Sequence, residues 1–334
     1  MDVVTVRHRD GIHFEGEPHV VADARSAVGD VNIVSHAHAD HTFGSTTSSP
    51  ETIVCSAETA EIAKARSGAE FAFVESTPAI DLVPAGHVVG SRAALFEDAS
   101  GRRYCYTGDF SIRDRAYLEG FDPDAIEADV LVMETTYGLP KYRFPDQAEL
   151  EAQIRDWITD TADRPLFLFG YSLGRAQKLQ WLASEVSDRE LLVSESIDRV
   201  NRAIEAATSL SFSARSYGDG ELRDLSDEIV VLPSNQARAD WVERTVEAVS
   251  GHKAGFSGWA VDDGFLYRGN YDVTFPLTDH CDYDELIETV EAVDPDVVYT
   301  NHGFDEAFAD VLETNYGYRA RPLKRNQTTL EEFC

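Results

Sequence analysis

The sequence contains only five lysines among 334 residues, and it has no long apolar run. No stretch approaches the ~18 uninterrupted apolar residues of a membrane-spanning helix, so we expect no membrane span. The first residues, MDVVTVRHRDG, lack the basic segment followed by an apolar run that marks a signal peptide, and none is expected. The cysteines are scattered and form no Cys-x-x-Cys pair, which favours reduced thiols in a cytoplasmic protein over a disulfide framework. They are Cys55, Cys105, Cys281 and Cys334.

Positive charge is also scarce. The chain carries 60 acidic residues against 29 Lys and Arg, for a net charge of −31. This composition is typical of adaptation to high intracellular salt, where surface carboxylates keep a protein hydrated and salt screens their repulsion. The alternative is a surface that repels nucleic acid. Because the acids are diffuse and form no single tail, we favour the salt interpretation, which leaves a polyanionic substrate possible in principle.

The apolar fraction of 43% fits a globular chain with one large or two modest cores. Through about residue 135, short β-rich runs alternate with turn signals: VVTVRH, VNIVS, TIVCS, FAFV, RYCYTGD and DVLVME. One helix is expected within them, over 57–66. From about residue 146, apolar strands PLFLFG, ELLVS and EIVVLP alternate with helical patterns, which predicts βαβ units around a parallel sheet, inserted into the first domain. The helices are expected near 148–162, 174–187, 197–208, 236–250, 282–293 and 304–316.

The stretch SHAHADHTFG, residues 35–44, crowds three histidines and an aspartate into six residues directly after the apolar strand VNIVS. Imidazole and carboxylate suit zinc, and two metals about 3.5–4 Å apart form a common hydrolytic centre. The alternative is a polar surface loop that happens to be rich in histidine. Four ligands do not fill two coordination spheres, so the metal hypothesis requires further ligands downstream.

Three downstream stretches supply such residues. PAGHVVGS offers His87, YTGDFS offers Asp109 at a strand end, and YTNHGF offers His302 after the strand DVVYT. Each alone is more often a satisfied polar residue than a ligand. Together they complete a set for two zinc ions, with manganese as a possible substitute. One metal would take His36, His38 and His87, the other Asp40, His41 and His302, and Asp109 would bridge them.

The order HxHxDH, AGHxxGS and YTGD resembles the metallo-β-lactamase superfamily, whose fold is an αβ/βα sandwich. METTYG, LGRAQKL and LTDHCDYDEL resemble its nucleic-acid-processing β-CASP branch, which includes RNase J, the endonuclease of mRNA 3′-end formation, and Artemis-like and ligase-associated DNA nucleases. The similarity extends from about Asp23 to Tyr318. It implies a metallo-β-lactamase domain over 1–145 and 263–334, with an α/β β-CASP domain inserted at 146–262.

The resemblance also implies roles for individual residues. His280 would be the general acid for the leaving oxygen, oriented by Glu134, and Asp40 counts as catalytic as well as a ligand. The chemistry agrees, since histidine titrates in the useful range and a carboxylate fixes its tautomer. Glu134 could instead be a helix cap or a surface carboxylate, but it ends the apolar strand DVLVM. Asp23 would support the metal loop without ligating.

A polyanionic substrate needs local positive charge. Arg175 is the favoured phosphate-binding residue, together with Ser172 of the same stretch, because Gly174 precedes an apparent helix start whose N–H groups bind anions. The alternative is that Arg175 pairs with a surface carboxylate.

The predicted function is therefore a zinc-dependent nuclease. An inactive interaction subunit would lose several ligands, and a small-molecule hydrolase would lack the insert and its motifs. RNA is favoured over DNA by a narrow margin, with a ligase-associated or repair-type DNA exonuclease as the alternative. Oligomeric state cannot be read from the sequence.

Overall fold

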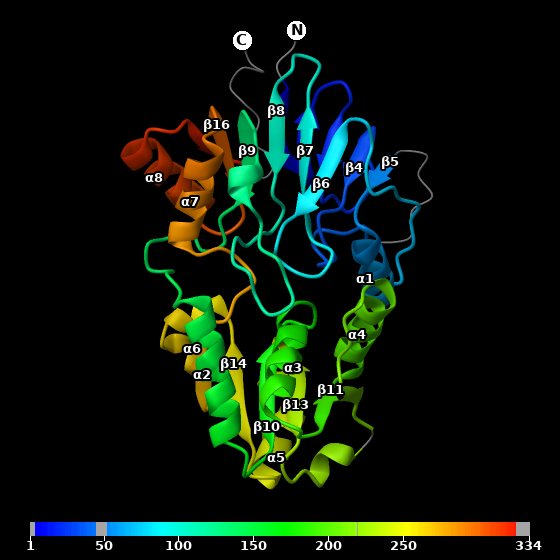
Figure 1. Ribbon diagram of the computed structural model, residues 1–334, viewed down its shortest axis with the longest axis vertical. Coiled ribbons are helices and arrows are strands. Elements are labelled where there is room, and N and C mark those ends of the chain that lie inside the picture. The colour runs from blue at the N-terminus through cyan, green and yellow to red at the C-terminus, as the bar shows by residue number, and fades with distance from the viewer. Residues whose placement is uncertain (1–3, 45–51, 219, 325–334) are drawn as a thin grey trace. The chain divides into compact units, whose positions relative to one another are not determined.

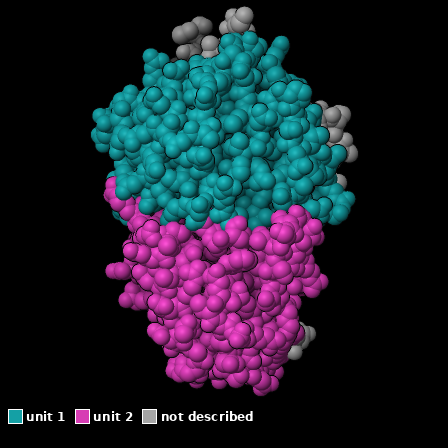
Figure 2. Space-filling view, in the orientation of Figure 1, with its two compact units in different colours: residues 1–114, 118–141, 280–334 teal, residues 115–117, 142–279 magenta. Residues whose placement is uncertain are grey.

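A computed structural model describes residues 4–44, 52–218 and 220–324 (Figure 1). The chain divides into two compact units, coloured separately in Figure 2, and each is described by itself. Unit 1 comprises Met1–Asp114, Leu118–Lys141 and His280–Cys334, and unit 2 comprises Arg115–Tyr117 and Tyr142–Asp279. The domain boundaries expected from the sequence stay a prediction. Across the described residues, no helix has the length and apolar character needed to cross a membrane.

Unit 1 contains two β-sheets (Figure 1). The first has the order β1-β2-β3-β4-β5, with β1 (Thr5–Arg9), β2 (Gly11–Glu15), β3 (Val20–Ala22), β4 (Val31–Ile33) and β5 (Thr52–Val54). The second has the order β17-β16-β9-β8-β7-β6, with β6 (Ile80–Pro84), β7 (Arg92–Glu97), β8 (Arg103–Tyr106), β9 (Val130–Glu134), β16 (Val297–Asn301) and β17 (Ala320–Pro322). The helices of this unit are α1 (Ala57–Ser67), α7 (Tyr283–Val293) and α8 (Asp305–Val311), the last continued by a π-helical turn, Leu312–Tyr316.

The alternation of side chains along β9 explains the layering of unit 1. Val130 and Val132 pack into a core shared by both sheets, whereas Leu131 and Met133 point to the other face, into a core formed with α7 and α8. A strand buried on both faces reads as a continuous apolar run, as DVLVM does. Helix α1 packs through Ala60 against the first sheet. The layers are therefore helix, sheet, sheet, helix, which confirms the predicted αβ/βα sandwich.

Unit 2 is built around a six-stranded sheet in which every neighbouring pair is parallel. The order is β12-β11-β13-β10-β14-β15, with β10 (Leu166–Gly170), β11 (Leu191–Val193), β12 (Arg215–Ser216), β13 (Ile229–Pro233), β14 (His252–Phe256) and β15 (Val273–Phe275). Along β10, Leu166 and Leu168 enter one core, and Phe167 and Phe169 enter the core on the opposite face. The helices are α2 (Gln147–Asp160), α3 (Arg175–Val186), α4 (Glu195–Ala207), α5 (Asp240–Ala248) and α6 (Gly264–Gly269).

Two sequence expectations differ from the structure. The run FAFV, residues 71–74, forms no strand, and only Val74 makes an isolated bridge, to Val54. Phe71 instead packs edge-on against Phe43, so its ring is partly buried without strand pairing. The helix expected over 236–250 begins at Asp240, because Ser234–Gln236 forms a separate 3₁₀ turn.

Candidate metal centre

The predicted metal ligands and the His280–Glu134 pair all belong to unit 1. Strands β8, β9 and β16 run parallel, so their carboxyl ends meet at one edge of the sheet. Asp109 follows β8, Glu134 ends β9 and His302 follows β16. The chain thus gathers residues that are distant in sequence, as parallel sheets commonly do at functional sites.

Tight backbone turns carry two of the ligands to this edge. Gly86, before His87, has a φ of +69°, and an added Cβ would lie 2.2 Å from the carbonyl oxygen of Ser111. Gly108, before Asp109, has a φ of +56° and lies against Ser35, where a Cβ would meet the side chain at 2.6 Å. Only glycine fits either position, which accounts for the AGH and TGD motifs.

Four side chains form a tight group. His38 Nδ1 lies 3.0 Å from His36 Nε2 and 3.2 Å from His87 Nε2. Asp109 Oδ2 lies 3.6 Å from His36 Nε2 and 3.7 Å from His87 Nε2. Ligand atoms ~2.0–2.1 Å from a tetrahedral zinc ion lie about 3.3–3.4 Å apart. Three imidazoles and a carboxylate at this spacing fit a zinc ion in both donor type and geometry.

Hydrogen bonds behind the group fix which ring nitrogens face it. Ser35 Oγ donates to Asp23 Oδ2 at 2.6 Å and lies 3.0 Å from His36 Nδ1, so its oxygen accepts from His36 Nδ1–H. His41 Nδ1 lies 2.8 Å from Asp23 Oδ2 and donates to it. In both histidines Nε2 is therefore the nitrogen that faces the centre. Asp23 supports the loop from behind, and Tyr106 Oη also donates to it at 2.7 Å.

A second set of predicted ligands is more open. His41 Nε2 lies 3.8 Å from Asp40 Oδ2 and 3.8 Å from Asp109 Oδ2. The ring of His302 lies 5.5 Å from that of His41. Asp40 has a side chain that is 72% exposed, and His302 is also exposed. Asp109 Oδ2 is thus nearly equidistant from the two sets, in the position that a bridging ligand would take.

Burial and charge act together on the ionisable groups. Burial lowers the pKa of His36 well below its usual 6.5, with neighbouring His41 acting in the same direction, so His36 stays neutral as a metal ligand must. Burial also opposes the charge on His41, but Asp109, Asp23 and Asp40 outweigh it and raise the pKa of His41 to about 10. The carboxylates therefore stabilise positive charge at this point.

His280 and Glu134 form a second feature beside the group. His280 Nδ1 lies 2.8 Å from Glu134 Oε1, and Glu134 Oε2 accepts from the Thr136 N–H at 2.7 Å. The atoms of Asp109, Glu134 and His280 that could bind a metal lie within 4.8 Å of one another. The rings of His87 and His280 are 4.6 Å apart. The pair thus lies next to the predicted metal ligands.

Several supporting residues were not found from the sequence. Arg113 Nη2 donates to the carbonyl oxygen of His280 at 3.1 Å, while its Nε pairs with Glu285 at 2.7 Å. Ser35 and Tyr106 contact Asp23. Ser35 adjoins the histidine loop, which is a signal that could have found it. Tyr106 is the first residue of the YTGD stretch, which is a signal that could have found it, whereas nothing in the sequence around Arg113 distinguishes it from an ordinary loop residue.

The predicted substrate-binding residues, Arg175 and Ser172, belong to unit 2. Arg175 begins α3 but is only 2% exposed, and its Nε lies 3.2 Å from Asp279 Oδ2. Its guanidinium also lies 4.3 Å from the ring centroid of Tyr171. The carbonyl oxygen of Ser172 accepts from Gln177 Nε2. Arg175 pairs with a buried carboxylate, not a surface one, and its phosphate-binding role stays a prediction.

Comparison with known proteins identifies relatives of this chain. No family model matches the chain. A probable DNA ligase from Opitutus terrae is 35% identical over 295 residues, which are 84% of this chain and 27% of that protein. An RNase J-like protein from Methanocaldococcus jannaschii is 34% identical over 97 residues, covering 28% of this chain and 23% of that protein. Subunit 3 of the cleavage and polyadenylation specificity factor from Dictyostelium discoideum is 32% identical over 103 residues, covering 30% and 13%.

A crystal structure of a protein of unknown function from Enterococcus faecalis shares the fold, with a TM-score of 0.65 at 15% identity over 97% of this chain and 99% of that one. The chain spans between 13% and 27% of the lengths of the three curated relatives. Fold, motifs and relatives together confirm the resemblance: the chain belongs to the β-CASP branch of the metallo-β-lactamase superfamily.

Proposed function

We propose that the protein is a metal-dependent nuclease that hydrolyses phosphodiester bonds, with two zinc ions as its native cofactors and manganese able to replace them. The observation that carries this proposal is the placement of the His280–Glu134 pair beside three imidazoles and Asp109. The tight group supports one zinc ion, and Asp40, His41 and His302 supply the second site. When bound, the ions would place positive charge at the scissile phosphate and lower the pKa of a shared water.

Side chains of the protein itself would then protonate the leaving group. Burial would raise the pKa of Glu134, but His280 and the Thr136 N–H hold it below its usual value, so Glu134 remains a carboxylate. It orients the imidazole through Nδ1 and stabilises its protonated form. His280 Nε2–H is then available to protonate the departing oxygen, and histidine is the side chain most often used as a general acid.

DNA is the substrate that the comparisons favour. The motifs alone lean narrowly to RNA, but a match that covers 84% of the chain is with a probable DNA ligase. We therefore propose a DNA exonuclease that prepares ends for joining. RNA processing is the second candidate, because an RNase J-like protein and a cleavage and polyadenylation factor subunit match 28% and 30% of the chain.

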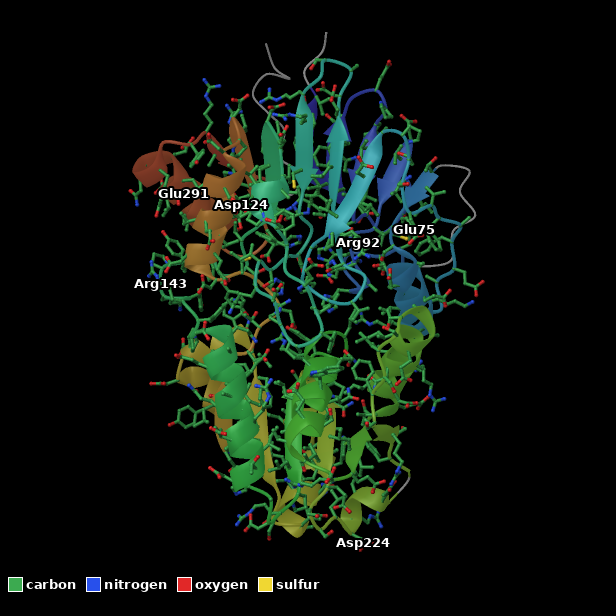
Figure 3. The ribbon with its side chains drawn as sticks, viewed as in Figure 1. Glu75, Arg92, Asp124, Arg143, Asp224 and Glu291 are labelled. Carbon is green, nitrogen blue, oxygen red and sulfur yellow. The ribbon has the colours of Figure 1, made fainter. Side chains whose placement is uncertain are left out.

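The acidic surface supports function at high salt inside the cell. Exposed carboxylates occur on both units, for example Glu75, Asp124 and Glu291 on unit 1 and Asp224 on unit 2 (Figure 3). Among the described cysteines, Cys55, Cys105 and Cys281 are buried free thiols, in agreement with the proposed cytoplasmic location.

The test is cleavage of end-labelled single-stranded DNA and RNA of matched sequence by zinc- or manganese-loaded protein in high salt. Preferential shortening of DNA is expected, with His280→Ala as the inactive control. Preferential cleavage of RNA would establish the second candidate. Cleavage of neither strand by metal-loaded protein would contradict the nuclease proposal.

A further inference from the structure

A cavity of about 310 Å³ opens in unit 2 at the carboxyl ends of three neighbouring parallel strands. Tyr171 follows β10, Ser234 and Asn235 follow β13, and Ser257 follows β14, and all four line the cavity. Ligands of parallel α/β sheets bind at this edge, where loops rather than helices cover the strand ends. The volume lies at the lower end of the range for ligand pockets, about 300–1,000 Å³, which suits a single nucleotide-sized group.

The charge of this cavity is opposite to that of the protein. Among the residues that the structure describes, its lining contains Arg175, Arg238 and Arg268 and no aspartate or glutamate, although the chain has 60 acidic residues. A cavity of about 550 Å³ in unit 1 is lined instead by carboxylates, including Glu15 and Glu17. An arginine-lined cavity in so acidic a chain indicates selection for an anionic ligand.

Two of the three arginines have no carboxylate to neutralise them. Arg175 is paired with Asp279, but Arg238 and Arg268 are exposed and form no ion pair with any residue in the described part of the chain. Lys253 lies behind the cavity, where its Nζ donates to the carbonyl oxygens of Ala237 and Gly269 and lies 3.9 Å from Glu243 Oε1. Guanidinium groups at such a rim are suited to bidentate binding of a phosphate.

Aromatic rings form much of the remaining lining. Tyr171 is 54% exposed, and the Arg175 guanidinium holds its ring from one side. Trp259 packs edge-on against Tyr142, and Tyr271 stacks on Phe265. A cation rim beside exposed aromatic surface is the combination by which proteins hold single-stranded nucleic acid, with phosphates on arginine and bases on rings.

We propose that this cavity binds one nucleotide of a single-stranded nucleic acid, with its phosphate between Arg238 and Arg268 and its base stacked on Tyr171. The inference rests on the proposed nuclease function and deepens it, because it names a contact with the strand that uses none of the predicted metal ligands. It also gives a protein with a net charge of −31 a place to hold a polyanion, because three arginines line this cavity.

The test measures binding of a labelled single-stranded oligonucleotide by fluorescence anisotropy over a range of salt concentrations. The full chain carries His280→Ala so that the strand stays intact. Adding Arg238→Ala and Arg268→Ala should weaken binding about tenfold or more and reduce the slope of log affinity against log salt by ~0.7, the value for the single phosphate that the two arginines would hold. Arg244→Ala, an exposed arginine on α5 outside the cavity, is the matched control and should change neither quantity.

A second variant separates base from phosphate. Tyr171→Leu should weaken binding about fivefold or more while leaving the salt slope unchanged, because stacking releases no counterions. Competition with a nucleoside monophosphate and with inorganic phosphate distinguishes a nucleotide site from a simple anion site. Displacement by phosphate as effective as by the nucleotide would overturn the stacking assignment. Unchanged affinity and slope in the double arginine variant would overturn the cavity proposal.

Failure of this proposal can be told from failure of the proposed function. Cleavage is measured in parallel with proteins that retain His280. Normal cleavage by the double arginine variant, together with normal binding, overturns the cavity alone. Absence of cleavage by the unmodified protein overturns the nuclease function, while the anisotropy experiment still reports whether the strand occupies the cavity.

Discussion

His280 Nδ1 lies 2.8 Å from Glu134 Oε1, and the other oxygen of Glu134 is held by the Thr136 N–H. Glu134 is only 1% exposed, so water does not compete for the carboxylate. The imidazole is thereby fixed in orientation, and its Nε2 is left for a reacting group. Because the pair is proposed to supply a proton and not to bind metal, substitutions in it should separate an effect on catalysis from an effect on metal binding.

Replacing His280 should remove the proton donor without removing metal. We expect His280→Ala to lower kcat by roughly 10²–10⁴-fold, the usual range for general acid–base catalysis, with near-normal zinc content by elemental analysis. Glu134→Gln should act in the same direction but less strongly, since the imidazole remains. Loss of zinc from His280→Ala would show that His280 is a ligand.

Asp109 should matter to both ions. Its Oδ2 lies 3.6 Å from Nε2 of His36, 3.7 Å from Nε2 of His87 and 3.8 Å from Nε2 of His41. We expect Asp109→Ala to reduce bound zinc by more than one ion per chain, whereas His38→Ala should cost about one. Mass spectrometry of the intact metal-loaded protein measures both stoichiometries. Equal losses in the two variants would argue against a bridging carboxylate.

Asp23 should control metal affinity without touching metal. Its two oxygens accept hydrogen bonds from the backbone and hydroxyl of Ser35, from Tyr106 and from His41. Asp23→Asn replaces one acceptor oxygen with an NH₂ donor, so we expect zinc affinity to fall 10–100-fold. Tyr106→Phe, which removes one donor only, is the milder comparison. Competition with a zinc chelator measures the affinity, and unchanged values for Asp23→Asn would contradict the supporting role.

Lys178 should make the stability of unit 2 depend on pH. Burial, together with Arg115, lowers its pKa from 10.5 to about 8, against the opposing effect of Asp279. Between pH 8 and 10.5 the unfolded chain therefore binds more protons at this lysine than the folded one, so its contribution to the free energy of unfolding rises with pH. The free energy of unfolding of the unmodified protein minus that of Lys178→Met should increase by up to ~1.4 kcal/mol per pH unit in this window.

Denaturant unfolding followed by tryptophan fluorescence measures this difference, because all four tryptophans belong to unit 2. They are Trp157, Trp181, Trp241 and Trp259. Parallel stability curves for the two proteins from pH 8 to 10.5 would mean that Lys178 titrates normally.

The clustering of the predicted ligands could be anticipated because they are adjacent in sequence or follow apolar strands, and strand ends converge on one sheet edge. The contacts of Arg175 could not be predicted, since its partner Asp279 lies on a distant segment and no local pattern links the two residues. The prediction of a strand at FAFV was wrong for a related reason: Phe71 packs against the ring of Phe43, and its backbone does not pair with a neighbouring strand. Periodicity reports which side chains are buried, but not what buries them.

The order in which the site is completed during synthesis follows from where its parts lie along the chain. All four residues of the tight group precede residue 110 in the chain, whereas Glu134 meets its partner only after another 146 residues have been made. Domains generally fold as they emerge from the ribosome, N-terminal parts first. A nascent chain thus contains all four side chains of the tight group long before it contains His280, the proposed proton donor, which follows directly on the last residue of unit 2.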